Sequence, residues 1–155
     1  MKTLEIIFGI LLFIVCYTYV GYGIVLWIMV TIKRIFGKKK ELPEIEEWPE
    51  VTLFITAYNE ELVVEDKMKN CLELDYPKDK LHIVWVTDGS TDHTNELLHR
   101  YPEVKIYYHE ARKGKTAAMN HGIRHVKTPF VIFTDANTYI NSEAVKEMMK
   151  RFVNP

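Results

Sequence analysis

The chain has 155 residues, of which 48% are apolar, and its formal net charge is −1. This length allows one domain of ordinary size with an appendage. Apart from a short basic segment after the N-terminal apolar stretch there is no basic stripe, so we expect no nucleic-acid partner. Cys16 and Cys71 fall in different predicted elements and are not expected to form a disulfide.

One uncharged stretch dominates the N-terminal part of the chain. Residues 6–32 contain no Asp, Glu, Lys, Arg or His, and this stretch exceeds the roughly 20 residues that span a bilayer as a helix. A secretory signal would have a shorter apolar core and a cleavage site of small residues. We therefore predict a transmembrane helix over residues 1–32. The alternative is a buried helix of a soluble protein.

Basic residues follow this stretch and predict its orientation. Lys33, Arg34 and residues 38–40 lie after it, whereas Lys2 and the chain's amino group are the only cations before it. The positive-inside rule then places the C-terminal side in the cytoplasm, and the basic residues should contact anionic lipid head groups. We predict a single-pass protein of the cell membrane, with a basic and then acidic linker over residues 33–50.

The rest of the chain, residues 51–155, alternates between predicted strands and predicted helices. Runs of apolar and β-branched residues mark the strands, and apolar faces with helical spacing mark the helices. Alternation of this kind predicts an α/β fold, with a mostly parallel sheet and flanking helices. The predicted strands are residues 51–56, 81–87, 104–109 and 128–134, and the predicted helices are residues 61–72, 92–101, about 115–126 and about 142–152.

Polar clusters follow three of these predicted strands, at residues 56–60, 88–92 and 135–137. The carboxyl ends of parallel strands share one edge of a sheet, where open α/β folds bind ligands. The oxygens of Asp135 and Asn137, two residues apart, can face one hard cation that carries phosphates. The three clusters together predict a nucleotide crevice. Taken alone, the pair Asp135 and Asn137 is better explained as a polar turn that caps a strand.

Other motifs are incomplete. Residues 114–116 (Gly-Lys-Thr) resemble the end of a phosphate-binding loop, but His109 stands where that loop needs a glycine. Lys115 can still act as a point charge for a phosphate or a base carbonyl, or be a solvated lysine at a helix start. His121 and His125 share a helix face, but no Glu follows His121 and no Cys pair lies nearby. We therefore expect surface or capping histidines rather than zinc ligands.

Four segments occur in an order and spacing typical of a known family: Ile55–Glu60, Val86–Asp92, Arg112–Asn120 and Phe133–Asn137. Together they resemble the inverting family 2 glycosyltransferases, and in layout the membrane-anchored branch that includes cellulose and hyaluronan synthases. The resemblance covers about residues 49–155. It implies a GT-A fold with a Rossmann-like half, and transfer of a hexose-type unit from a nucleotide sugar to a glycan or lipid acceptor.

The resemblance also implies roles for single residues in nucleotide binding. Thr56 and Tyr58 match positions that hold the nucleobase, with Tyr58 stacking on it, and Ala57 between them belongs to the same site. Glu60 matches a residue near the ribose and base. Asp88 matches the acid that bonds the uracil ring, which favours a UDP-sugar as the donor.

The same resemblance implies a metal site. Asp135 and Asn137 match an Asp-x-Asp motif that binds the donor diphosphate through Mg²⁺ or Mn²⁺, and Lys115 matches a base or phosphate contact. A divalent ion offsets charge on the leaving diphosphate. Asn137 keeps an oxygen but lacks the charge of the usual acid, so we expect lower metal affinity or binding by Asp135 with water. Thr87 replaces another common Asp, with little expected effect.

An inverting transfer needs a general base, and in this family the base is an Asp on a later segment. We assign no catalytic base within the chain and expect it beyond Pro155. We interpret the 155 residues as the donor-binding half of a longer enzyme, the alternative being a short protein that binds without transfer. A non-catalytic, membrane-anchored nucleotide-binding or regulatory module is a second possibility. A nucleotidyltransferase is a third, but residues 57–60 lack its glycine-rich loop.

Overall fold

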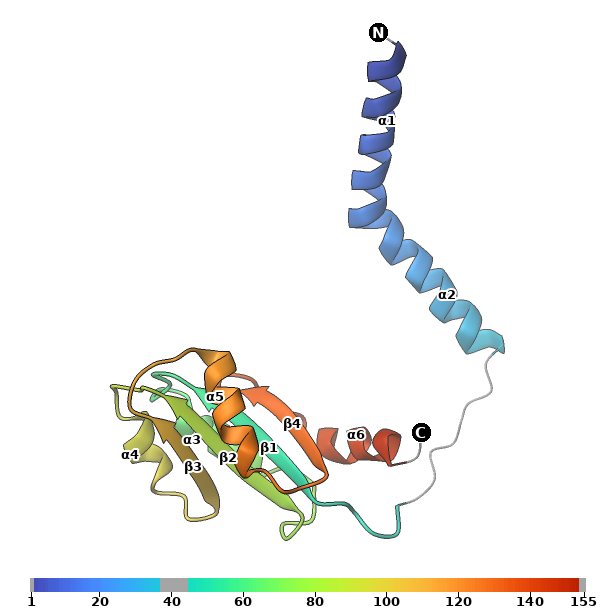
Figure 1. The fold of residues 1–155 in the computed structure, drawn as a ribbon. Helices are drawn as coiled ribbons and strands as arrows, with labels where there is room; N and C mark the ends of the chain where they lie inside the picture. The colour runs from blue at the N-terminus through green and yellow to red at the C-terminus, as the bar shows by residue number, and fades with distance from the viewer. Residues whose placement is uncertain (1, 37–44, 154–155) are drawn as a thin grey trace. The chain divides into compact units, whose positions relative to one another are not determined.

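A computed structural model describes residues 2–36 and 45–153 of the chain (Figure 1). The chain divides into two compact units, Met1–Glu41 and Leu42–Pro155, which are described separately. Part of the predicted linker, residues 37–44, lies outside the described residues. The basic residues 38–40 are therefore known from the sequence alone.

The first unit is a single long helix. It consists of α1 (Lys2–Cys16), a π-helical turn η1 (Tyr17–Gly21) and α2 (Tyr22–Phe36). In the part of the chain that the structure describes, this is the one helix long and apolar enough to cross a membrane. The hydroxyls of Thr18 and Thr31 donate hydrogen bonds to carbonyls one turn earlier, each at 2.8 Å. The predicted apolar helix is therefore present, and it continues to Phe36 rather than ending at residue 32.

The second unit is built on a four-stranded sheet in which every pairing is parallel. The predicted α/β fold with a parallel sheet is confirmed, and each predicted strand is present with end shifts of at most two residues. The strands are β1 (Val51–Ala57), β2 (Leu81–Asp88), β3 (Val104–His109) and β4 (Phe130–Asp135), in the order β3-β2-β1-β4.

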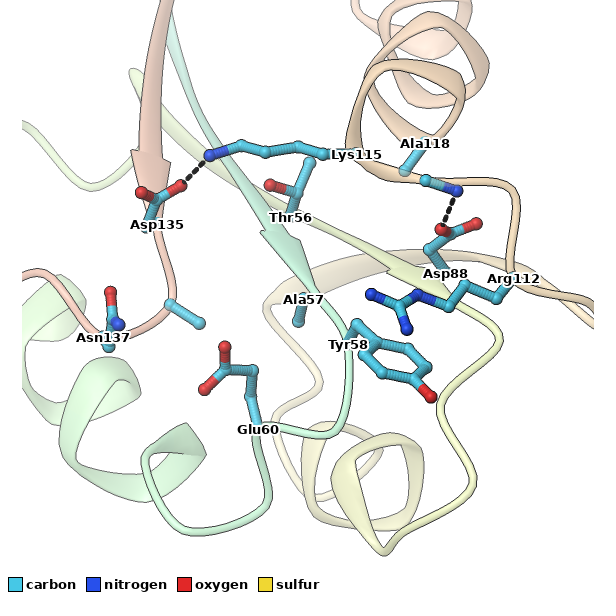
Figure 2. A pocket seen from close by; sticks show the side chains of 12 residues that line it. Thr56, Ala57, Tyr58, Glu60, Asp88, Arg112, Lys115, Ala118, Asp135 and Asn137 are labelled. Carbon is cyan, nitrogen blue, oxygen red and sulfur yellow. Dashed lines mark hydrogen bonds and ion pairs between the residues drawn. The ribbon is translucent and has the colours of Figure 1, made fainter.

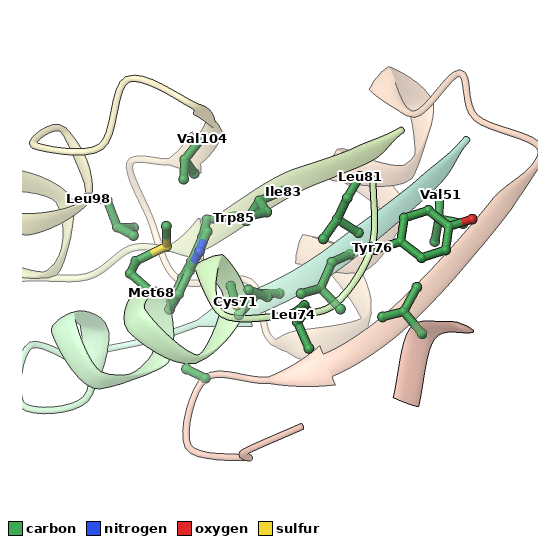
Figure 3. Close-up of a cluster of buried hydrophobic side chains, with 14 of the residues drawn as sticks. Val51, Met68, Cys71, Leu74, Tyr76, Leu81, Ile83, Trp85, Leu98 and Val104 are labelled. Carbon is green, nitrogen blue, oxygen red and sulfur yellow. The ribbon is translucent and has the colours of Figure 1, made fainter. Parts of the chain in front are cut away.

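Helices cover both faces of the sheet (Figure 1). The larger buried cluster lies between one face and α3, α4 and α6, and it includes Trp85 of β2 and Met68 of α3 (Figure 3). The smaller cluster joins Phe54 and Val86 to Ala118 of α5 on the other face. Burial on both faces explains the continuous apolar runs of β1 and β2. The helices are α3 (Val64–Leu72), α4 (Thr94–Leu98), α5 (Lys115–Gly122), the 3₁₀ turn η2 (Ile123–His125) and α6 (Ala144–Phe152).

The helices are shorter than predicted, because polar side chains hold their flanks in turns. α3 begins at Val64 rather than residue 61, since the Glu61 N–H donates to Asp92. Asp92 also accepts the Thr94 N–H at 3.0 Å, just before α4 begins, whereas His93 holds the N-cap position of that helix. Leu72, the last residue of α3, is 37% exposed.

Gly122 ends α5 where the helix lies closest to the sheet. A Cβ atom there would lie 2.6 Å from Phe54 Cζ and closer still to Val86 Cγ2. Replacing a helical glycine with alanine normally stabilises a protein by roughly 1 kcal/mol. Here we expect Gly122→Ala to lower the free energy of unfolding by about 1–3 kcal/mol, because of overpacking.

Urea unfolding in detergent, followed by circular dichroism, measures this effect. Asn120→Ala, on an exposed position of the same helix, is the control and should change stability by less than about 0.5 kcal/mol. A gain of stability in Gly122→Ala would contradict the close packing of α5 against the sheet.

Candidate functional site

The polar clusters predicted from the sequence meet at one cavity of about 340 Å³ at the carboxyl edge of the sheet (Figure 2). All of the predicted site residues line it, and so do four residues that the sequence analysis did not select. The predicted ones are Thr56, Ala57, Tyr58, Glu60, Asp88, Lys115, Asp135 and Asn137, and the others are Arg112, Gly114, Ala118 and Ala136. Their proximity is therefore established, whereas their roles stay predictions.

Strand register explains why these residues meet. Thr56 of β1 pairs with Asp135 of β4, so the two strands end together. Successive side chains of β2 point to opposite faces. Asp88 therefore lies at the cavity, while the buried Thr87 donates its hydroxyl hydrogen to Asn95 of α4 at 2.7 Å. The departure from the family pattern at Thr87 is thus on the side of the sheet away from the cavity.

Asp88 anchors the segment that leads into α5. Its carboxylate is 3% exposed and accepts the Lys113 N–H at 2.9 and 3.1 Å and the Gly114 N–H at 2.6 Å. Next to it, Gly89 has φ +70°, and a Cβ atom there would lie 2.9 Å from the Ala111 carbonyl carbon. The turn after β2 and the segment before α5 therefore fit closely, and Asp88 has a structural task that the sequence did not reveal.

Arg112 is a cavity residue that sequence reasoning missed. Its guanidinium carbon lies 3.9 Å from the centroid of the Tyr58 ring, in cation–π geometry. The predicted base-stacking residue thus carries a positive charge on one face of its ring (Figure 2). Arg112 begins one of the four family-like segments, but nothing in the local sequence indicated that it would reach Tyr58.

Lys115 and Asp135 face each other across the cavity edge. The Lys115 ammonium lies 2.5 Å from Asp135 Oδ1, and both side chains are more than half exposed. An ion pair that exposed contributes little to stability. It shows, however, that the Asp135 carboxylate is directed at a position where a cation sits.

The protein oxygens available at the cavity fit a divalent ion that is also coordinated by the phosphates of a bound molecule. In the described residues no three His, Cys, Asp or Glu side chains gather as a ready metal site. Asp135 and Asn137 line the cavity, and one or two such oxygens, with phosphates and water, are the usual surroundings of Mg²⁺. Burial raises the pKa of Glu60, and the negative charges of Asp135 and Asp92 raise it further.

Hydrogen bonds between two loops shape the floor of the site. Asn59 has φ 54° and accepts the Thr91 N–H at 2.8 Å, while Thr94 Oγ1 accepts the Glu60 N–H at 2.9 Å. These bonds tie the turn after β1 to the turn after β2. Several polar residues of the family-like segments therefore hold the loops together rather than face the cavity.

The rings of three histidines form a cluster, with His109 at the end of β3, His121 in α5 and His125 in η2. The ring centroids of His109 and His121 are 4.1 Å apart, and those of His121 and His125 are 5.6 Å apart. His125 also stacks on Tyr107 at 4.2 Å. The prediction of surface histidines is confirmed for His125, which is exposed, whereas His121 is half-buried in this cluster. Desolvation lowers the pKa of His121, and the charges of His109 and His125 lower it further.

This cluster predicts how stability depends on pH. Because the folded state lowers the pKa of His121 below its ordinary value of 6.5, the unfolded chain takes up a proton that the folded chain resists. Stability should therefore fall as the pH drops through 6.5. The effect of His93 on stability has the opposite sign, because its hydrogen bond to Glu61 raises its pKa in the folded state. The stability that protonated His93 contributes is lost as the pH rises through this raised pKa.

Urea unfolding at pH 7.5 and pH 5.5 separates the contributions of His121 and His93 to the pH dependence of stability. His121→Gln should lose less stability on acidification than the wild type, and His93→Gln should lose more. An unchanged pH dependence in His121→Gln would contradict the role given to its burial.

Comparison with known proteins identifies the family. Residues 52–155 match the family model described as glycosyl transferase family 2, and the chain belongs to this family. The resemblance found in the four sequence segments is thereby confirmed.

The curated proteins similar to this chain include polysaccharide synthases. The chain is 30% identical over 124 residues to the poly-beta-1,6-N-acetyl-D-glucosamine synthase of Staphylococcus aureus (strain COL). The aligned region covers 78% of this chain and 29% of the relative. It is 29% identical over 136 residues to the enzyme of the same name from Staphylococcus epidermidis, which covers 81% and 32%. The chain therefore spans about a third of the length of these relatives.

Solved structures agree on the fold. The mannosyltransferase PcManGT from Pyrobaculum calidifontis, in complex with GDP-Man and Mn²⁺, superposes with a TM-score of 0.73 at 30% identity, covering 91% of this chain and 43% of that one. S. aureus TarS 1-349 in complex with UDP-GlcNAc gives a TM-score of 0.61 at 26% identity, covering 64% and 30%. The parallel sheet with flanking helices is thus a GT-A-like fold.

Proposed function

We propose that the chain binds a nucleotide-sugar donor in the cavity at the carboxyl edge of its sheet. It would be the donor-binding part of a membrane-anchored glycosyltransferase that transfers a hexose-type unit, with inversion, to a glycan or lipid acceptor. The observation that carries this proposal is the convergence of Tyr58, Asp88, Lys115 and Asp135 on one cavity. Family membership supports it, as do the nucleotide-sugar complexes of two similar structures.

Each cavity residue has a task in this proposal. Tyr58 and Thr56 hold the nucleobase, with Ala57 beside them, and Glu60 lies near the ribose. Asp88 bonds a uracil ring with the hydrogen-bonding capacity that its two amide partners leave free. This favours a UDP-sugar, although the GDP-Man complex of a similar structure keeps a guanine nucleotide as the second candidate.

The proposed metal is Mg²⁺ or Mn²⁺, held by Asp135 and Asn137 together with the donor phosphates. When bound, the ion offsets charge that builds on the leaving diphosphate. The Mn²⁺ complex of PcManGT supports this assignment. Lys115 would exchange its ion pair with Asp135 for a contact with the donor phosphates, because metal and ammonium compete for the same carboxylate. No described residue is proposed as the general base.

We propose three regions along the chain: a membrane helix in residues 1–32, a linker in residues 33–50, and the donor-binding part in residues 51–155. The folded domain would face the cytoplasm, as Lys33 and Arg34 at the end of α2 favour. In intact cells, a cysteine introduced at the exposed Glu46 should react with membrane-permeant maleimide and not with an impermeant one. Reaction with both reagents would show that the folded domain faces the outside of the cell instead.

Calorimetry tests the binding proposal. UDP titrated into the chain in detergent with Mn²⁺ should give saturable heat, EDTA should weaken the binding, and GDP should bind more weakly than UDP. Tighter binding of GDP than of UDP would identify a GDP-sugar, rather than a UDP-sugar, as the donor. A folded chain that binds neither nucleotide would contradict the proposed site.

A further inference from the structure

Lys67 of α3 is an unusual residue in this fold. Its side chain is 1% exposed, although lysines are almost never fully buried without a partner of opposite charge. Among the described residues none of the ion pairs involves Lys67. Its ammonium instead donates to Thr134 Oγ1 at 3.1 Å and to the Thr138 carbonyl oxygen at 2.5 Å.

These two acceptors bracket the proposed metal ligands. Thr134 directly precedes Asp135, and Thr138 directly follows Asn137. The Thr138 N–H donates to the Asp135 carbonyl oxygen at 3.3 Å, which closes a turn. Lys67 therefore bonds to the chain on both sides of this turn.

The rest of the turn leaves its two polar side chains facing outward. Ala136, between Asp135 and Asn137, is 3% exposed and packs into the larger hydrophobic cluster. Asn70, further along α3, bonds both backbone groups of Ile140. Its side-chain amide donates to the Ile140 carbonyl oxygen at 2.8 Å, and its Oδ1 accepts the Ile140 N–H at 2.9 Å. α3 thus fixes the chain at Thr134, Thr138 and Ile140, from the end of β4 onward.

We propose that Lys67 is a positioning residue of the donor site, which holds the 135–138 turn so that Asp135 and Asn137 present their oxygens together to a metal-bound diphosphate. This inference rests on the proposed function. Asn137 supplies no charge to a metal, so the site depends on accurate placement of its few oxygens. A buried ammonium supplies that accuracy, because one of its acceptors is a backbone carbonyl oxygen and the other is the hydroxyl of a short β-branched side chain with few rotamers.

Lys67→Met tests the proposal, because it keeps most of the side-chain volume and removes the donors. Lys69→Met is the matched control, since Lys69 lies on the same helix and is exposed. Both variants are compared with the wild type, in detergent, for binding of UDP with Mn²⁺ and of uridine, which lacks the diphosphate. Loss of such an outer partner lowers metal affinity by roughly 10–100-fold. We expect a loss of this size for UDP, with uridine affinity within about twofold.

A purely structural role would give a different pattern. If Lys67→Met lowers UDP and uridine affinity equally, or leaves UDP affinity unchanged, the positioning role is overturned. If Lys67→Met does not fold, Thr134→Val decides, because it removes one acceptor in nearly the same shape. Selective weakening of UDP then supports the proposal, and unchanged UDP affinity overturns it.

A measurement without nucleotide separates this inference from the proposed function. The amide hydrogen of Thr138 should exchange with solvent faster in Lys67→Met than in the wild type and Lys69→Met. If the wild type does not bind UDP, the proposed function fails while faster exchange still supports the clamp on the turn. Unchanged exchange at Thr138 overturns the clamp whether or not UDP binds.

Discussion

Replacing Asp135 with alanine is expected to lower the affinity for UDP in the presence of Mn²⁺ by more than roughly 100-fold. Loss of an outer partner alone costs a metal site up to about that factor, and Asp135 would contact the ion directly. It is also the only charged member of the proposed ligand pair, because position 137 is an asparagine. Calorimetric titration of UDP at fixed Mn²⁺ measures the change, and uridine should bind Asp135→Ala as it binds the wild type.

Position 137 provides the matched comparison. Asn137→Ala removes a neutral oxygen and should weaken UDP binding less than Asp135→Ala does. Asn137→Asp restores the usual second acid, so the Mn²⁺ concentration needed for half-maximal UDP binding should fall. Wild-type affinity in Asp135→Ala would show that the metal, or the diphosphate, is held elsewhere.

Asp88→Ala is expected to have the largest effect on stability, lowering the free energy of unfolding by about 2–4 kcal/mol. The substitution leaves the N–H groups of Lys113 and Gly114 without the carboxylate that accepts their hydrogen bonds. The segment before α5 would lose its anchor, and Lys115 would lose its position. UDP binding should therefore fall together with stability, as urea unfolding and calorimetry can measure.

The neighbouring residue is the control for this effect. Thr87→Val also removes a buried hydrogen bond, the one to Asn95, and should cost about 1 kcal/mol. Because Thr87 faces α4, UDP affinity should be unchanged. Asp88→Asn keeps the shape but loses one acceptor and the charge, so an intermediate loss is expected. Full stability of Asp88→Ala would contradict the anchoring role.

The strand ends were predictable, because their signal is local. Apolar runs such as residues 51–56 and 81–87 indicated strands buried on both faces, and the rule that parallel strands end at one edge brought the polar clusters together. The structure confirms this arrangement with Thr56 beside Asp135 in the register. The chemistry assigned to these residues came from the family resemblance and stays a prediction.

Other features depend on contacts between distant segments and leave no local pattern. Asp88 accepts hydrogen bonds from residues 25 and 26 positions later, and Arg112 reaches Tyr58 only because the intervening loops fold against each other. Lys67 is a charged residue on a helix, where an exposed position is expected, and it is nevertheless buried. Its burial follows from the path of the chain after β4, which the sequence of α3 does not encode.

Photo-labelling locates the proposed nucleotide-sugar site at the carboxyl edge of the sheet directly. An azido-uracil derivative of UDP-glucose would be bound to the chain with Mn²⁺, irradiated, and the attached peptides identified by mass spectrometry. We expect labelling of the segments around Tyr58 and Arg112, lost on addition of excess UDP. Labelling that UDP does not prevent, or that lies on α6, would contradict a donor site at this edge of the sheet.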